Sequence, residues 1–300
     1  MSRPSLSPMS LFTRAGAATT TISRKGVIKK IIILAALCQL ILVLFVWKDS
    51  SRVSRNLLEK SNADRLVVYN SVGGANNLAF INHSRITAFP KEDWDCLIFM
   101  YVKEDHISDD DIHLINLREN LGCTVPRTPG MLWGTFLQFI TPTLVANYDY
   151  IALVLDDVFI PNQGKHPVNI DKMVKTMEER DIHVMTPGII GDTYGFINKA
   201  QEQGLDECIA EASMIETYLQ IFTRDAWECY YHMLHYTGAK GWWYDMCYKS
   251  ECPDFKLAYD FSMFAYHVDK ENIELPKDEI VNTDLVNWKP DPKVTENGYF

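Results

Sequence analysis

The segment YIALVLDD, residues 150–157, joins six apolar residues directly to two adjacent carboxylates. A run that is apolar at every position is typical of a strand covered on both faces, as in a parallel α/β sheet. Ligands of such sheets bind outside the carboxyl ends of the strands. The segment therefore predicts a buried strand over 150–155, and it places Asp156 and Asp157 at an edge where ligands bind.

Other apolar runs alternate with helical patterns, which indicates a Rossmann-type, mostly parallel α/β sheet flanked by helices. Further strands are expected over 66–70, 96–102, 182–187, 215–222 and 257–268. Helices are expected over 109–121, 135–146, 205–212 and 226–237. Ser108 and Asp111 resemble a capping box that opens the first helix, and Pro142 interrupts the second. Together these elements predict one domain over 65–275 and a loose tail over 276–300.

Residues 31–47 form an uncharged apolar run whose single amide is Gln39. Such a run can cross about 30 Å of hydrocarbon, with the lysines at its amino end snorkelling. Because residues 1–30 hold six bases and no acid, the N-terminus is expected in the cytosol. We expect a basic tail over 1–28, a single-pass signal-anchor helix over 29–47, a stem over 48–64 and a lumenal body in the Golgi or endoplasmic reticulum. A cleaved signal peptide or an organellar transit peptide is the alternative.

The rest of the chain is acidic. The whole chain has a net charge of −10, and residues 31–300 hold 23 bases against 39 acids. An acidic surface argues against a nucleic-acid partner, because phosphate binding needs positive charge.

Six cysteines lie beyond the apolar run: Cys96, Cys123, Cys208, Cys229, Cys247 and Cys252. A lumenal location permits up to three disulfides, and some of these residues can equally be buried thiols. Cys247 and Cys252 could join His267 in a zinc site, although their spacing is not that of a zinc ribbon. The single glycosylation sequon is Asn82-His83-Ser84.

Asp156 and Asp157 are candidate metal ligands. Adjacent carboxylates repel each other, so they need a cation or a raised pKa. Mg²⁺ and Mn²⁺ take one or two carboxylates together with substrate phosphates. An ordinary solvated turn is the alternative. Asp109, Asp110 and Asp111 form a rival acidic cluster, whose place at an expected helix start favours a capping role.

The stretch GWWYD, residues 241–245, is a second candidate site. Trp242 and Trp243 can stack a sugar ring while Asp245 acts as a general base. Glu216 is a weaker candidate of the same kind, and His267 could complete a metal shell with the acids. Each has a structural alternative, since paired tryptophans and a lone histidine also occur in ordinary cores. The chain has no glycine-rich dinucleotide or phosphate loop, no zinc-protease motif and no serine nucleophile elbow.

Several stretches over residues 65–270 resemble the plant-centred domain-of-unknown-function 707 family, which is glycosyltransferase-like. The resemblance is carried by LWGTFLQFITPTLVANYDYI (132–151), ANYDYIALVLDDV (146–158), ETYLQIFTRDAWECYYHM (216–233), GWWYD (241–245) and the late His267. That family is similar to nucleotide-sugar transferases of the GT-A fold. The resemblance therefore implies a GT-A-like domain with a nucleotide-sugar co-substrate and Mn²⁺ or Mg²⁺ as cofactor.

The resemblance also implies roles for single residues. Asp157, with Asp156 beside it, matches the D-x-D-type acids that hold the metal on the donor diphosphate, and His267 matches a metal or diphosphate ligand. Asp245 matches the base that acts on the acceptor, and Glu216 an acceptor-side residue. Trp242 and Trp243 then belong to the donor-binding site.

One position departs from the family's pattern, because Leu155 stands where a further acid is usual. The expected function is transfer of a hexose from a nucleotide diphosphate donor to a hydroxyl acceptor such as a glycan. The alternative is a lumenal binding or scaffold protein that kept the fold without the chemistry, which Leu155 favours. A nucleotidyltransferase would use similar acids, but it fits the membrane anchor and the acidic body less well.

Overall fold

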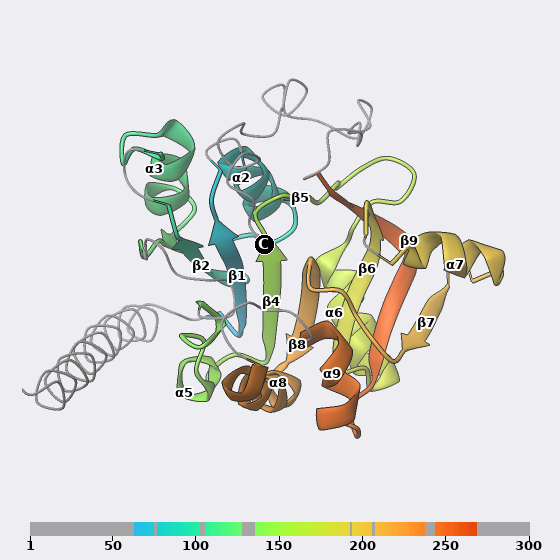
Figure 1. Cartoon of the computed structure of the whole chain (residues 1–300). Coiled ribbons are helices and arrows are strands. Elements are labelled where there is room, and N and C mark those ends of the chain that lie inside the picture. The colour runs from blue at the N-terminus through green and yellow to red at the C-terminus, as the bar shows by residue number, and fades with distance from the viewer. Residues whose placement is uncertain are drawn as a thin grey trace, which may run out of the picture. The chain divides into compact units, whose positions relative to one another are not determined.

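A computed structural model describes residues 63–74, 77–102, 106–127, 136–192, 194–205, 208–237 and 244–268 (Figure 1). All of them belong to one compact unit, Arg52–Phe300. The expected span at 29–47, the stem and the tail at 276–300 lie outside the described residues. Within those residues, no helix combines the length and the apolar character needed to cross a membrane. The expected domain boundaries therefore stay predictions.

The described residues form one nine-stranded sheet. Its strands are β1 (Arg65–Val72), β2 (Trp94–Met100), β3 (Cys123–Thr124), β4 (Tyr150–Leu155), β5 (Val158–Phe159), β6 (Val184–Ile190), β7 (Ile209–Ala212), β8 (Leu219–Thr223) and β9 (Leu257–His267). Their order across the sheet is β3-β2-β1-β4-β8-β6-β9-β5, with β7 paired to β9. Each strand expected from the sequence overlaps a strand of the structure, and β4 occupies the expected range 150–155.

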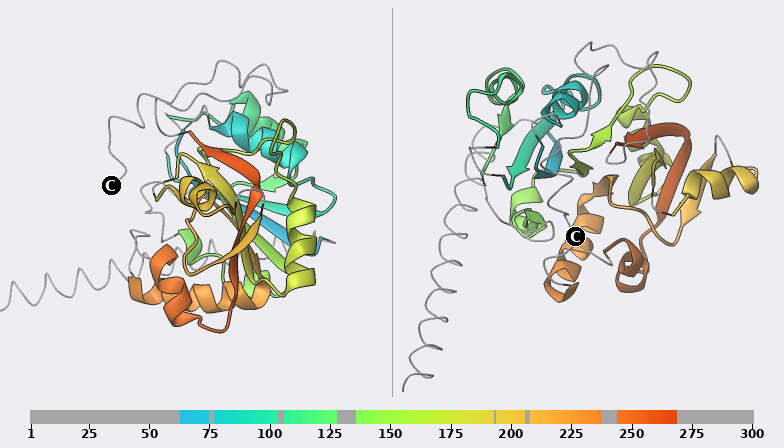
Figure 2. Two further views of the ribbon diagram at one scale, coloured as in Figure 1. Left: turned by 90° about the vertical axis from the view of Figure 1, so that its right-hand side faces the viewer. Right: turned by 45° about the horizontal axis from the view of Figure 1, so that its top comes forward.

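Helices cover both faces of the sheet: α2 (Leu78–Thr87), α3 (Ile112–Glu119), α5 (Pro142–Val145), α6 (Ile170–Arg180), α7 (Phe196–Glu202), α8 (Arg224–Thr237) and α9 (Tyr244–Glu251). Figure 2 shows α6 on one side of the strands and α8 and α9 on the other. Ala152 and Val154 join the hydrophobic cluster of the α6 face, whereas Ile151 and Leu153 join that of the α8 face. Burial on both faces explains why β4 is apolar at every position.

The two halves of the sheet differ in strand direction. β3, β2, β1 and β4 are all parallel to one another. Beyond them, β8 is antiparallel to both β4 and β6, and β5 and β7 are antiparallel to β9, while β6 and β9 are parallel. The expectation of a mostly parallel sheet is therefore wrong for the second half, and the sheet is mixed. Because β8 is reversed, it begins at the edge where β4 ends.

Two expected helices differ in the structure. Over 136–146, residues 136–137 are helical and a turn separates them from α5, which Pro142 begins, because a first-turn proline lacks only an N–H that has no helical partner. Over 205–212 the described residues include β7, which pairs with β9. That pairing overrides the helical propensity of the segment IAEA.

The expected helices over 226–237 and 109–121 correspond to α8 and α3. α3 begins only at Ile112, and its N-cap is Asp111, whose carboxylate accepts from the backbone N–H groups of His113 and Leu114. The capping role expected of the acidic cluster is thus confirmed at Asp111. Asp109 instead bonds Arg118 and Arg127.

Cysteine pairing corrects two readings of the sequence. Disulfides join Cys96 to Cys123 and Cys229 to Cys252, while Cys208 and Cys247 are free thiols. The pairing of Cys252 rules out the zinc site that it would have shared with Cys247 and His267.

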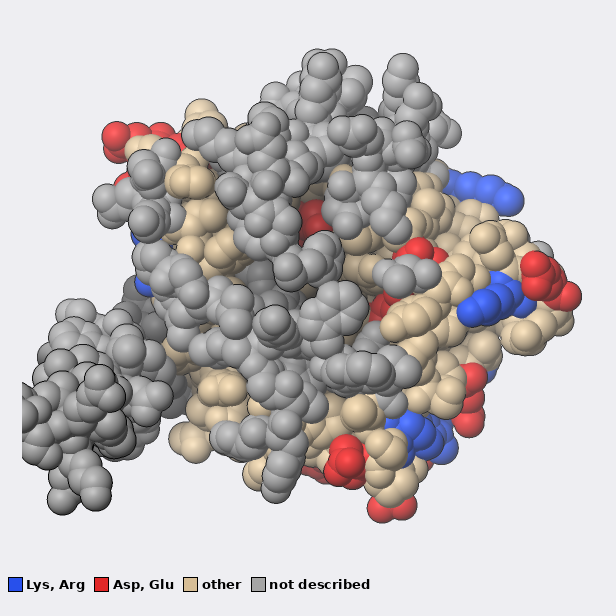
Figure 3. Space-filling view, in the orientation of Figure 1, with Lys and Arg blue, Asp and Glu red and all other residues tan. Residues whose placement is uncertain are grey.

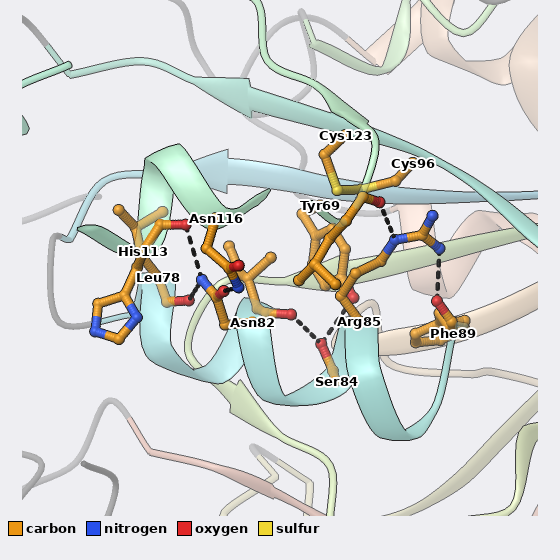
Figure 4. Close-up of a disulfide and its surroundings, with 12 residues drawn as sticks. Tyr69, Leu78, Asn82, Ser84, Arg85, Phe89, Cys96, His113, Asn116 and Cys123 are labelled. Carbon is orange, nitrogen blue, oxygen red and sulfur yellow. Dashed lines mark hydrogen bonds between the residues drawn. A yellow bond between two sulfur atoms is a disulfide. The ribbon is translucent and has the colours of Figure 1, made fainter. Parts of the chain in front are cut away.

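The sequon asparagine is a packed core residue. The Asn82 amide donates to the carbonyls of Leu78 (2.9 Å) and His113 (3.1 Å) and accepts from Asn116, beside the Cys96–Cys123 bridge (Figure 4). Asn82 is only 4% exposed, so in the folded protein its amide has no access to a glycan.

Candidate active site at the carboxyl edge of the sheet

The strand directions gather the candidate residues at one edge of the sheet. β1, β4, β6 and β9 all end there, and β8 begins there. Asp156 and Asp157 follow β4, Glu216 precedes β8, and His267 ends β9. The end of β4, the start of β8 and the end of β9, three segments that are far apart in the sequence, thereby lie at the edge where α/β folds bind ligands.

Asp157 and His267 form a direct pair. Oδ2 of Asp157 lies 3.2 Å from Nε2 of His267, and the side chains are 23% and 7% exposed. The pairing of Val158 with His267 and the bond from the Val268 N–H to the Asp157 carbonyl (2.9 Å) hold the two residues in register. The other carboxylate oxygen of Asp157 is buried, with no hydrogen-bond partner among the described residues. The pair is thus rigidly placed, with one acceptor oxygen unused.

The surroundings of His267 orient its ring. Nδ1 lies 3.4 Å from the carbonyl of Gly191, and the Tyr218 ring packs 4.2 Å from the imidazole centre. A carbonyl can only accept, so Nδ1 carries the proton when this bond is made, and Nε2 of the neutral ring presents a lone pair to Asp157. In the other neutral tautomer Nε2–H donates to Asp157, whereas in this one a lone pair and a carboxylate oxygen lie 3.2 Å apart and repel each other unless a positive charge lies between them. That charge can be a proton or a metal ion.

Asp156 faces the opposite way. Its Oδ2 accepts hydrogen bonds from the Gly73 N–H (2.9 Å) and from Nδ2 of Asn77 (3.1 Å), both in the turn between β1 and α2. Burial, followed by repulsion from Asp157, raises the pKa of Asp156 to about 7, against the bonds from Gly73, Asn77 and the Gly74 backbone. A cation bound near this edge would lower the pKa of Asp156 again.

Glu216 is buried just before β8, and its backbone N–H donates to the hydroxyl of Tyr259 (3.1 Å), which lies near the start of β9, whereas His267 ends that strand. From Tyr259 a row of rings leads outward. Phe196 lies 5.1 Å from Tyr259 and 5.8 Å from Tyr194, which is 37% exposed. The row connects Tyr259, which the Glu216 backbone contacts, with a ring at the surface.

The loop that carries Tyr194 leaves β6 beside His267, starting at Gly191. Asp192 fixes this loop, because its carboxylate accepts from the N–H groups of Gly195 (2.7 Å) and Phe196 (2.6 Å). The loop therefore lies between the histidine of the pair and the aromatic row.

The structure does not bring every predicted site residue to this edge. Trp242 and Trp243 lie outside the described residues. Asp245 is the second residue of α9, and its side chain is not described. α9 packs through Tyr248 against Phe222, and both residues line a small cavity with Ile215, the neighbour of Glu216. The roles of these three residues stay predictions.

Sequence reasoning missed Asn77 and Tyr194, which contact or approach the site across more than 30 intervening residues. Among the described residues, no three His, Cys, Asp or Glu side chains come close enough to form a metal site by themselves. A metal here would have Asp157 and His267 as its protein ligands. On the described part of the face in Figure 3, lysine and arginine lie singly among acidic side chains, without a continuous basic patch.

No protein-family model matches the chain, and no curated protein sequence matches it. The resemblance to the domain-of-unknown-function 707 family therefore stays a prediction. Among solved structures, the chain is similar to the mannosyltransferase PcManGT from Pyrobaculum calidifontis, determined in complex with GDP-Man and Mn²⁺. The identity is 12% and the TM-score 0.45, over 80% of this chain and 68% of that one. The reaction must accordingly be argued from the site itself.

Proposed function

We propose that this protein is a glycosyltransferase that moves a sugar from a nucleotide diphosphate donor to a hydroxyl of a glycan or similar acceptor. The observation that supports the proposal is the Asp157–His267 pair, 3.2 Å apart at the ligand-binding edge of the sheet. A nucleotide diphosphate brings negative charge, and this pair has a place for the cation that such a ligand requires.

Mn²⁺ or Mg²⁺ fits the pair as cofactor. Asp157 offers a buried oxygen without a partner among the described residues, and His267 has its other nitrogen tied to a backbone carbonyl, as in most metal-binding histidines. These ions commonly take one or two protein ligands and complete their shell with phosphates and water. Asp157 and His267 would hold the ion, which when bound supplies charge neutralisation to the leaving diphosphate.

Glu216 is the proposed base for the acceptor hydroxyl, because it is a buried carboxyl shortly before β8, the strand that begins where β4 ends. Its position is set through its backbone by Tyr259. Asp245 keeps this role as the second candidate. Sugars pack their apolar faces on aromatic rings, so Tyr194 is the proposed contact for the acceptor, and Trp242 and Trp243 for the donor.

The test uses the full-length protein in detergent. We expect UDP or GDP to raise the unfolding midpoint only with Mn²⁺, and the matching nucleotide sugar to be slowly hydrolysed. Asp157→Ala should remove both effects. The exposed carboxylate Asp254, which precedes β9, provides the control, since Asp254→Ala should leave both unchanged. Metal-independent turnover, or unchanged turnover in Asp157→Ala, would sink the proposal.

A binding protein without chemistry is the second candidate, and Leu155 favours it. In the structure Leu155 packs against the hydrophobic cluster of the α6 face, where it adds no ligand to the edge. Mn²⁺-dependent nucleotide binding without any donor hydrolysis would select this candidate over the transferase.

We also propose that residues 29–47 anchor the protein in the Golgi or endoplasmic reticulum membrane, with the catalytic domain in the lumen. The charge asymmetry around the apolar run supports this orientation. In sealed microsomes, added protease should then spare the domain, and digestion without detergent would contradict the proposed topology.

A further inference from the structure

We infer that the two adjacent acids have separate roles: Asp156 is a positioning residue that fills a cradle of backbone N–H groups after β1, and Asp157 is the carboxylate that faces the ligand. This inference rests on the proposed function for the second role only. It revises the sequence-based expectation that both carboxylates hold the metal.

The contacts of Asp156 are all internal. One oxygen takes both the Gly73 N–H at 2.9 Å and the Asn77 amide at 3.1 Å, and the residue is 9% exposed. A buried backbone N–H needs an acceptor, and Gly73 obtains it from a residue 83 positions away. Asp157, in contrast, turns to β9 and keeps one oxygen without a partner among the described residues.

The cradle lies where many α/β proteins bind phosphate. A glycine turn between the first strand and its helix presents N–H groups that bind an anion. Here the side chain of Asp156 takes the place of such an anion. Asn77, the N-cap of α2, makes no side-chain cap to its own helix and donates to Asp156 instead.

The turn also requires a glycine at 73, because a β-carbon there would collide with the Tyr101 ring. It follows that a donor diphosphate cannot use these N–H groups while Asp156 occupies them. The diphosphate must then depend on the cation at Asp157 and His267. The hydrogen bonds of Asp156 also fix the backbone at the neighbouring Asp157, which helps to hold the Asp157 carboxylate close to His267.

Paired substitutions separate the two roles. Asparagine keeps the acceptor oxygen of Asp156 but removes the charge, whereas alanine removes both. At position 156 we expect Asp156→Asn to keep Mn²⁺ affinity within about tenfold of wild type and to rescue the thermal stability that Asp156→Ala loses. At position 157, Asp157→Asn and Asp157→Ala should both lose more than about a hundredfold in Mn²⁺ affinity and unfold near the wild-type midpoint.

Mn²⁺ alone is the probe, followed by electron paramagnetic resonance, and hydrogen exchange of the Gly73 amide reports the cradle. The amide should be protected in wild type and Asp156→Asn and unprotected in Asp156→Ala. Equal Mn²⁺ loss in Asp156→Asn and Asp157→Asn would overturn the inference, as would equal stability of the two variants at position 156. If the wild type binds no Mn²⁺, the metal-dependent function and the ligand-facing role of Asp157 fall together, while amide exchange and stability still decide the role of Asp156.

Discussion

The two halves of the sheet contribute to the site in different ways. The parallel half, β3-β2-β1-β4, supplies a closed arrangement in which Asp156, Gly73 and Asn77 satisfy one another. The mixed half, from β8 to β5, supplies His267 and the Gly191 carbonyl, and in the described part of the chain one oxygen of Asp157 has no hydrogen-bond partner. The difference teaches that a region whose polar groups are all hydrogen-bonded to one another can position a neighbouring region that keeps an acceptor available for a ligand.

Substitutions in the Asp157–His267 pair, which joins the two halves of the sheet, should have the largest effect. We expect Asp157→Ala to lower kcat for donor turnover by more than about a thousandfold, because the Lewis acid and its charge stabilisation are lost. His267→Ala should have a smaller effect of the same kind, which Mn²⁺ at high concentration partly rescues. Steady-state assays across a Mn²⁺ series measure both. Rescue of Asp157→Ala by Mn²⁺ alone would contradict its place as principal ligand.

Weakening the parallel half should cost stability rather than affinity. Cys96→Ser removes the bridge between β2 and β3, and we expect a loss of about 2–4 kcal/mol in the free energy of unfolding. Mn²⁺ affinity should stay unchanged, because the bridge is not at the site. Cys208→Ser, at an exposed free thiol, is the control and should change neither quantity. A loss of Mn²⁺ affinity in folded Cys96→Ser would mean that the halves are not separable in this way.

The pH dependence of stability sharpens the comparison at Asp156. Its pKa is raised to about 7 in the folded protein from 3.8, so the folded state holds an extra proton that the unfolded chain has released. That contribution to stability is complete at low pH and is lost as pH rises through 7. His83 has a lowered pKa and acts in the opposite direction, but only below its unfolded value of 6.5.

Between pH 6.5 and 8.5, metal-free protein should therefore lose about 1 kcal/mol in urea unfolding experiments. Asp156→Asn should flatten this slope, and saturating Mn²⁺ should do the same, because the cation replaces the proton near the paired acids. A stability that rises over this interval would show that the Asp156 pKa is not raised.

The smallest effect is expected at the rim of the mixed half. Tyr194→Ala should raise KM for a saccharide acceptor about threefold, without changing donor hydrolysis, because a single stacking contact is lost. Tyr194→Phe keeps the ring and is the matched control. An equal effect of Tyr194→Ala on hydrolysis would place this ring on the donor side instead.

Sequence predicted the parallel half better than the mixed half, for physical reasons. A strand buried on both faces, such as β4, is apolar throughout, and that signal needs no partner to be recognised. β7 reads as helix because its strand state depends on pairing with β9, more than 40 residues later. Likewise, the sequence singled out Asp157 and His267 separately, but only the fold brings them to 3.2 Å across 110 positions. Asn77 gave no signal at all, since nothing near it in the sequence indicates an acid.

The two hydrogen bonds that end on Asp156 also constrain how this protein can evolve. A change at 156 to a residue without an acceptor leaves the Gly73 N–H and the Asn77 amide without their hydrogen bond to this side chain. It is therefore expected to lower the stability of the fold, whatever its effect on a reaction. A change at 157, in contrast, is expected to leave the fold intact. If the proposed activity is lost in a related protein, we therefore expect the acid at 157 to be replaced first and an acceptor at 156 to be kept. An acid at 157 would then indicate activity, whereas an acceptor at 156 would indicate only a shared fold.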